Sequence, residues 1–82
     1  MSTIKVVKAK HEMTVVEIDE QVCNEDFWYF VKGTLDKRNI SSFTQNTYYQ
    51  DLNKNVVRIC LRNTTISTAN DVADEILEHI FN

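Results

Sequence analysis

The residues with the clearest potential for chemistry surround a cysteine in the last third of the chain. Cys60 lies between Arg58 and Arg62, and two neighbouring guanidinium groups would lower the pKa of its thiol and make it reactive. A thiol nucleophile also needs a base, and neither His11 nor His79 has a spacing that relates it to Cys60. We therefore interpret Cys60 as a structural thiol and leave a thiol-dependent enzyme as the less favoured hypothesis.

Metal binding and acid–base catalysis find no support in the spacing of the remaining polar residues. The two cysteines, Cys23 and Cys60, form no CxxC pair and no metal-ligand pattern with the histidines. Glu75 and Glu78 are helix neighbours that would face solvent, whereas catalytic carboxylates need a cleft that shifts a pKa. The single Gly and the absence of Pro exclude a Gly-rich phosphate loop. We predict a protein that is not an enzyme and that uses no cofactor or metal.

The element that would position any such site is a strand within residues 55–63. One alternate set of its residues is aliphatic and would face a core: Val57, Ile59 and Leu61. The other set would face water or a partner: Val56, Arg58, Cys60 and Arg62. This alternation predicts the central strand of a sheet, which the other segments pair with or cover.

The remaining periodicities predict three more strands and two helices. Strands are expected at 3–10, 14–19 and 41–50, and helices from Asn24 to about Asn39 and from Ser67 or Thr68 to Phe81. The predicted fold class is α+β, in the order ββαββα. We expect a four-stranded, mostly antiparallel sheet with both helices packed on one face, as a single domain over residues 1–82.

Several local features stay open or carry specific expectations. In the first strand, Ile4 and Val6 could face inward with Lys5 outward, or Val7 and Ala9 could face inward instead. The third strand would place Phe43 and Tyr49 on one face and Tyr48 on the other, before a hairpin loop at 51–55. Gly33 inside the first helix is expected to permit a close approach of helix and sheet. Asparagines are expected to make the turns that glycine usually makes.

The sheet face opposite the helices is the leading candidate for a binding surface. We expect it to carry these residues: Lys8, Lys10, Tyr48, Arg58 and Arg62. Cations interleaved with an aromatic ring suit single-stranded nucleic acid, because bases stack on rings while phosphates meet the cations. The alternative is that these are ordinary cross-strand pairs, for example Arg58 against Glu17. We favour protein binding as the function of this face and keep single-stranded nucleic-acid binding as the alternative.

The last helix presents an acidic outer face, with His79 beside it. Its carboxylates are Asp71, Asp74, Glu75 and Glu78, with no Lys or Arg among them. This stripe is either a solvated face that keeps the protein soluble or a second, weaker docking surface for a basic partner. The aromatic run 27–30 offers a further surface anchor in Trp28 or Tyr29.

Composition and charge bound the class of protein. The chain has 82 residues, of which 43% are hydrophobic and 26% are charged, values typical of a folded domain. The formal net charge of −3 argues against a dedicated binder of duplex DNA. No stretch is long enough to span a membrane, and the cysteine usage is that of a reduced compartment. We expect a cytoplasmic protein that does not insert into membranes.

The chain resembles the small accessory proteins of tailed (T4-like) bacteriophages. The resemblance lies in a short domain that begins Met1-Ser2-Thr3, ends on a helix at Asn82 and has the Lys, Asn and Ile usage of an AT-rich genome, as in Asp-Leu-Asn-Lys-Asn-Val-Val. It implies a regulator or inhibitor that binds one host or phage protein, such as a nuclease, toxin, polymerase subunit or lysis component, in the host cytoplasm. It transfers no site residues.

Self-association is a further expectation from the third strand. Residues 41–50 carry no charge and no proline, the devices that normally protect an edge strand from pairing. The stretch is therefore either an interior strand or one that pairs with another chain. We expect a homodimer, or a heterodimer with the target, formed through the sheet face or its edge.

Overall fold

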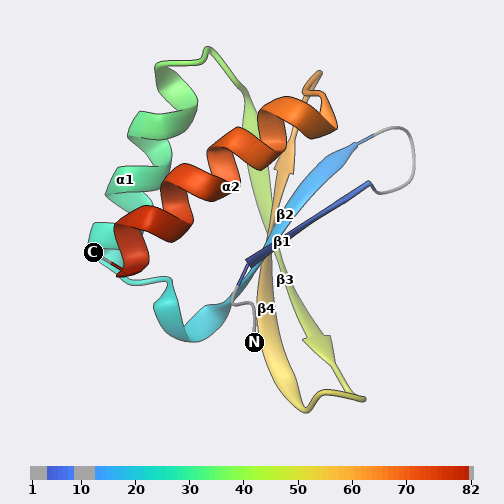
Figure 1. Cartoon of the computed structure of the whole chain (residues 1–82). Coiled ribbons are helices and arrows are strands. Elements are labelled where there is room, and N and C mark those ends of the chain that lie inside the picture. Colours follow the sequence, from blue (N-terminus) through green and yellow to red (C-terminus); the bar gives the residue numbers. More distant parts are fainter. Residues whose placement is uncertain (1–3, 9–12, 82) are drawn as a thin grey trace.

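The computed structural model describes residues 4–8 and 13–81, which form one sheet and two helices. The elements are β1 (Ile4–Lys8), β2 (Thr14–Asp19), a short 3-10 helix η2 (Glu20–Val22), α1 (Glu25–Asp36), β3 (Ser42–Tyr49), β4 (Lys54–Leu61) and α2 (Ile66–Phe81). The strands are antiparallel in the order β1-β2-β4-β3, and both helices lie on one side of the sheet (Figure 1). The predicted α+β class and ββαββα order are confirmed.

The core forms between the two helices and one face of β1, β2 and β4. The central strand supplies Val57, Ile59 and Leu61, each at most 4% exposed, as its alternation predicted. From the helices come the apolar residues that share one face of each: Phe27, Val31, Leu35, Ala69, Val72, Ala73 and Ile76. Burial of each large aliphatic or aromatic side chain contributes roughly 1.5–3 kcal/mol.

The helix ends are set by side-chain caps. Asn24 caps α1 as predicted, because its Oδ1 accepts a hydrogen bond of 2.8 Å from the backbone N–H of Phe27. The predicted cap of α2 was wrong: the helix begins at Ile66, and Thr65 Oγ1 accepts from the N–H of Thr68 at 3.1 Å. Because α2 begins at Ile66 and not at Ser67 or Thr68, Asp71 lies beyond the first turn of this helix.

Two expectations about glycine and its substitutes have different outcomes. Asn39, Asn53 and Asn63 adopt positive φ angles of 57°, 48° and 51°, so asparagine does make the left-handed turns. Gly33, in contrast, is exposed, and a Cβ added there would meet nothing within 4 Å. The expected close approach of α1 to the sheet at Gly33 was wrong.

The first and third strands form the two edges of the sheet. In β1 the register pairs Ile4 with Ile18 and Val6 with Val16, so Ile4 and Val6 face the core. Lys5 pairs with Glu17 on the other face, which is the first of the two alternatives for this strand. Of the connection expected between the strands at 3–10 and 14–19, the structure describes Met13. The distal half of the β3–β4 hairpin runs beyond the helices (Figure 1). Among the described residues, no helix is long and apolar enough to cross a membrane.

Candidate binding surface on the open sheet face

Register assigns each strand residue to the helix-covered face or to the opposite face, which we call the open face. The open face comprises Lys5, Val7, Val15, Glu17, Asp19, Phe43, Gln45, Thr47, Tyr49, Lys54, Val56, Arg58 and Cys60, with Arg62 just beyond the end of β4. Val56 and Cys60 were expected to face water or a partner. They are only 4% and 3% exposed within a single chain, so their burial does not require one.

A buried carboxylate organises the centre of this face. Glu17 is 8% exposed, and its Oε2 accepts a hydrogen bond of 2.6 Å from the hydroxyl of Tyr49. Arg58 Nε lies 3.2 Å from the same oxygen, and Lys5 Nζ lies 3.8 Å from Oε1. Residues from β1, β2, β3 and β4 thus meet at one carboxylate, and the interpretation of Arg58 as a cross-strand partner of Glu17 is confirmed.

The contact between Arg58 and Glu17 is an ion pair rather than a directed hydrogen bond. Arg58 Nε is buried and has no hydrogen-bond partner among the described residues, because its N–H does not point at the nearby oxygen. The hydrogen bond to Glu17 raises the pKa of the Tyr49 hydroxyl, burial and the Glu17 charge add to this, and Arg58 opposes it. The phenol is therefore held in its neutral, donating form. A third ion pair of this face joins Lys54 Nζ to Asp19 Oδ1 at 2.7 Å.

An exposed cation lies at the other end of the face. The guanidinium carbon of Arg62 lies 4.9 Å from the centroid of the Phe43 ring, a cation–π arrangement. Phe43 is half-buried and pairs with Cys60 in the ladder. No carboxylate of the described residues pairs with Arg62, in contrast to Lys5, Lys54 and Arg58.

The thiols lie in environments that disfavour the thiolate. Burial raises the pKa of Cys60 and outweighs the opposing effect of Arg58 and Arg62, so the hypothesis of a thiol activated by its two arginines is wrong in direction. Burial, with the charges of Glu20 and Asp19, raises the pKa of Cys23 to about 11. Within the part of the chain that the structure describes, no three His, Cys, Asp or Glu residues are grouped to hold a metal ion.

Two of the residues expected on the open face, Tyr48 and Lys8, have register positions on the helix-covered face instead. Tyr48 pairs with Asn55 and so lies on the opposite face from Arg58, where its hydroxyl donates to Asn53 Oδ1. The backbone of Lys8 pairs with Thr14, a register position on the helix-covered side. Lys10 lies outside the described residues. Of the members of the predicted set that the structure describes, Arg58 and Arg62 lie at this face.

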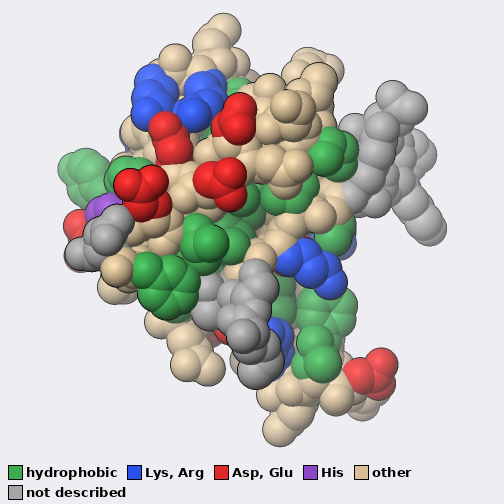
Figure 2. Space-filling model, viewed as in Figure 1, with side chains coloured by type: hydrophobic (Ala, Val, Ile, Leu, Met, Phe, Trp, Pro, Cys, Tyr) green, Lys and Arg blue, Asp and Glu red, His purple; other side chains and the backbone are tan. Residues whose placement is uncertain are grey.

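The acidic surface of α2 is partly neutralised by two basic residues that directly follow α1. Glu75 accepts from Lys37 Nζ at 3.0 Å and from Arg38 Nη1 at 2.7 Å, and these two contacts lower its pKa from 4.5 to about 2. Figure 2 shows Lys and Arg side chains directly beside acidic ones on this side of the molecule. Glu75 is therefore a link between helices, whereas Asp71, Asp74 and Glu78 remain exposed; their role in docking stays a prediction.

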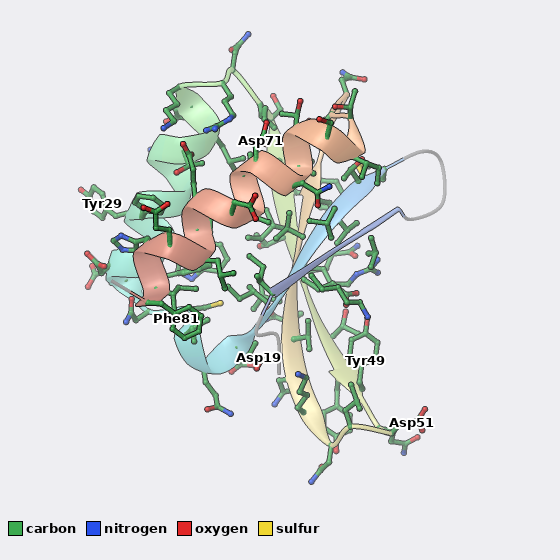
Figure 3. All side chains as sticks on the ribbon, in the orientation of Figure 1. Asp19, Tyr29, Tyr49, Asp51, Asp71 and Phe81 are labelled. Carbon is green, nitrogen blue, oxygen red and sulfur yellow. The ribbon has the colours of Figure 1, made fainter. Side chains whose placement is uncertain are left out.

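The aromatic run on α1 divides between core and solvent. Trp28 is half-buried and packs edge-on against Phe27, with ring centroids 5.0 Å apart. Tyr29 is 79% exposed and projects from the opposite side of the molecule to Tyr49 (Figure 3). Any contact made through Tyr29 would thus be separate from one made through the open face.

The sequence interpretation missed Phe43 and Tyr49 as members of this surface, because it made the hairpin loop one residue too long and started it one residue too late. It left the outward position of Lys5 as one of two alternatives for the first strand. The loop spans residues 50–53, and Tyr49 pairs with Lys54. A loop at 51–55 would instead have placed Tyr48 opposite Arg58. Since side chains alternate between faces, a shift of one residue moves a whole strand's side chains to the other face.

Comparisons with known proteins give no relative for this surface. No protein-family model matches the chain, and neither the curated proteins nor the solved structures include a match to it.

Proposed function

We propose that the protein is a non-enzymatic regulator or inhibitor that binds another protein through its open sheet face. The observation that carries this proposal is the Arg62–Phe43 pair, an exposed guanidinium stacked on an aromatic ring. Arginine and aromatic residues are the types that most often dominate the binding energy of protein interfaces. The centre and the far end of this face are held by internal ion pairs, so contacts made there would cost little ordering of side chains.

Charge placement favours a protein over a single-stranded nucleic acid. Glu17 and Asp19 lie among the cations of this face and already contact Arg58, Lys5 and Lys54. A phosphate backbone approaching these cations would also meet the two carboxylates. Nucleic-acid affinity comes mainly from cations that are free to replace counterions, and among the described basic residues of this face only Arg62 is without a carboxylate partner.

The partner we propose presents a carboxylate to Arg62 and an apolar group to Phe43. A host or phage protein is the target that the resemblance to phage accessory proteins implies, with the host cytoplasm as the site of action. The working unit we propose is a dimer, either with that target or with a second copy of the chain.

The test compares two substitutions that each remove one positive charge. Arg62→Ala removes the proposed anchor, and Lys32→Ala removes an exposed lysine on α1, away from the open face. The tagged protein and both variants are used to capture proteins from a bacterial lysate. A protein held by the wild type and Lys32→Ala but lost with Arg62→Ala supports the proposal. Equal capture by the wild type and both variants, or no capture by any of them, contradicts it.

A salt titration with a mixed-sequence single-stranded oligonucleotide tests the alternative function. Micromolar binding that falls steeply with salt and is lost with Arg62→Ala would replace protein binding by nucleic-acid binding as the function of this face.

A further inference from the structure

The two edges of the sheet differ in how they are protected from pairing. β1 is five residues long and carries Lys5 and Lys8, and lysines on a short strand are a common defence against edge-to-edge association. β3 is eight residues long and contains neither a charge nor a proline. It forms the opposite edge, since the strand order is β1-β2-β4-β3. The longer edge is the unprotected one.

The backbone groups that β3 presents at this edge follow from the ladder. Arg62 N–H donates to Ser41 C=O at 2.9 Å, so these two opposed residues form a hydrogen-bonded pair. Such pairs alternate along an antiparallel ladder, which directs the odd-numbered residues of β3 towards β4. The N–H and C=O groups that point away from β4 therefore belong to Ser42, Thr44, Asn46 and Tyr48.

The side chains of β3 leave this edge open on both faces. Ser42, Thr44, Gln45, Asn46 and Tyr48 are exposed, and the other three residues of the strand are half-buried. The helices therefore do not cover the strand, and Figure 1 shows its distal half running clear of them. A strand with polar groups on both faces is weakly specified by burial and open to pairing with another chain.

We propose that β3 pairs antiparallel with β3 of a second copy of the chain, about a two-fold axis at Gln45. This inference deepens the dimer proposed above and rests on it for the choice of a protein partner. A two-fold axis perpendicular to the sheet keeps both open faces on the same side. With the axis at Gln45, Ser42 lies opposite Tyr48 of the second copy, and Thr44 lies opposite its Asn46. Every outward N–H and C=O group of the strand then acquires a partner.

The composition of β3 suits a second copy of itself. On the open face, Gln45 meets Gln45 of the second copy, and an amide group can both donate to and accept from its own kind. Hydroxyl groups of Ser and Thr have the same property. No like charges are brought together anywhere along Ser42–Tyr49, although the chain as a whole has a net charge of −3. The pairing also joins the two open faces into one continuous surface.

Sedimentation velocity over a range of concentrations tests the pairing, with two variants of one residue. Asn46→Pro removes an outward N–H, which β4 does not use, and proline is tolerated at such edge positions. Asn46→Ala shortens the side chain and keeps the N–H. We expect a concentration-dependent dimer for the wild type and for Asn46→Ala. Because each copy loses one hydrogen bond, the dimerisation affinity of Asn46→Pro should be roughly tenfold to a hundredfold lower than that of the wild type.

The register is tested by cysteine cross-linking. Opposed residues in a non-hydrogen-bonded antiparallel pair have Cα atoms about 4.5 Å apart, within the range of a disulfide. Gln45→Cys should therefore form a disulfide-linked dimer under mild oxidation. Thr47→Cys, on the same face but two residues from the axis, should not, and the wild type controls for Cys23 and Cys60. Cross-linking of Thr47→Cys in preference to Gln45→Cys would refute the axis at Gln45.

Two results would overturn the pairing itself. One is a wild type that remains monomeric up to its solubility limit, and the other is dimerisation of Asn46→Pro at the wild-type affinity. Circular dichroism of Asn46→Pro confirms that the variant is folded; if it is not, the Gln45→Cys and Thr47→Cys pair decides the question. Arg62→Ala should dimerise normally, since it lies outside the paired edge. Failure of target binding and failure of edge pairing are thus distinguishable.

Discussion

Removing the hydroxyl of Tyr49 tests whether the Glu17 cluster stabilises the sheet. Tyr49→Phe keeps the ring and deletes the 2.6 Å hydrogen bond to Glu17 Oε2. Tyr48→Phe is the matched control, because this neighbouring hydroxyl contacts only the exposed Asn53 among the described residues. Glu17→Gln removes the carboxylate charge itself and leaves Arg58 without its counterion.

The expected magnitudes follow from the burial of each group. A hydrogen bond to a charged group contributes about 1.5–3 kcal/mol. Tyr49 is only half-buried, so water can replace part of the contribution of this hydrogen bond. We therefore expect Tyr49→Phe to lower the free energy of unfolding by about 1 kcal/mol. Breaking a fully buried ion pair costs roughly 3–5 kcal/mol. The side chains of Arg58 and Lys5 are 25% and 66% exposed, so these ion pairs are only partly buried. We therefore expect Glu17→Gln to lower the free energy of unfolding by about 2 kcal/mol.

Urea and thermal unfolding of the single and double variants provide the measurement. A loss of 1 kcal/mol corresponds to a fall in Tm of about 4–8 °C for a domain of this size, whereas Tyr48→Phe should stay within about 0.5 kcal/mol of the wild type. The coupling energy of Tyr49→Phe and Glu17→Gln should be near 1 kcal/mol. Equal effects of Tyr48→Phe and Tyr49→Phe, or additive effects of the pair, would refute the reasoning.

The pH dependence of the stability provides an independent test of the hydrogen bond between Tyr49 and Glu17. The pKa of Tyr49 is raised in the folded protein, so the folded state holds this proton more tightly than the unfolded state. The resulting stabilisation is complete below about pH 10, the ordinary pKa of tyrosine, and is lost as the pH rises through the folded pKa. The difference in stability between the wild type and Tyr49→Phe should therefore narrow above about pH 10.

Three further predictions concern other parts of the molecule. Gly33→Ala should raise the free energy of unfolding by about 0.5–1 kcal/mol, measured from the urea midpoint, because alanine favours a helix and its Cβ meets nothing within 4 Å. The pKa of Glu75 is lowered from 4.5 to about 2, so the stability advantage of the wild type over Glu75→Gln should be present above pH 4.5 and disappear as the pH falls towards 2; Glu78→Gln should show no such acid-dependent loss. Iodoacetamide should alkylate Cys60 in the folded protein more slowly than a model thiol near neutral pH, since burial raises the pKa of that thiol; faster alkylation would restore the reactive-thiol hypothesis.

The sequence by itself determined the elements, because their signals are local. The alternation of Val57, Ile59 and Leu61 specifies the covered face of β4, and an apolar spacing of four residues specifies the buried face of α1. The capping role of Asn24 and the asparagine turns follow from the chemistry of single side chains. Since a ββα order repeated once leaves few antiparallel arrangements, the fold class followed from these elements.

Only the tertiary structure decided which side chains meet. Whether Tyr48 or Tyr49 shares a face with Arg58 depends on a difference of one residue in the length of the hairpin loop, and local propensity does not fix loop boundaries to that accuracy. The pairing of Glu75 with Lys37 and Arg38 joins residues far apart in sequence, so no spacing could indicate it. The sequence also did not decide whether β3 is an interior or an edge strand, because its lack of charge is compatible with both. Strand order is set by how the helices and β4 pack. Register and packing arise from contacts summed over the whole sheet, which is why the composition of the open face appeared only once the strands were paired.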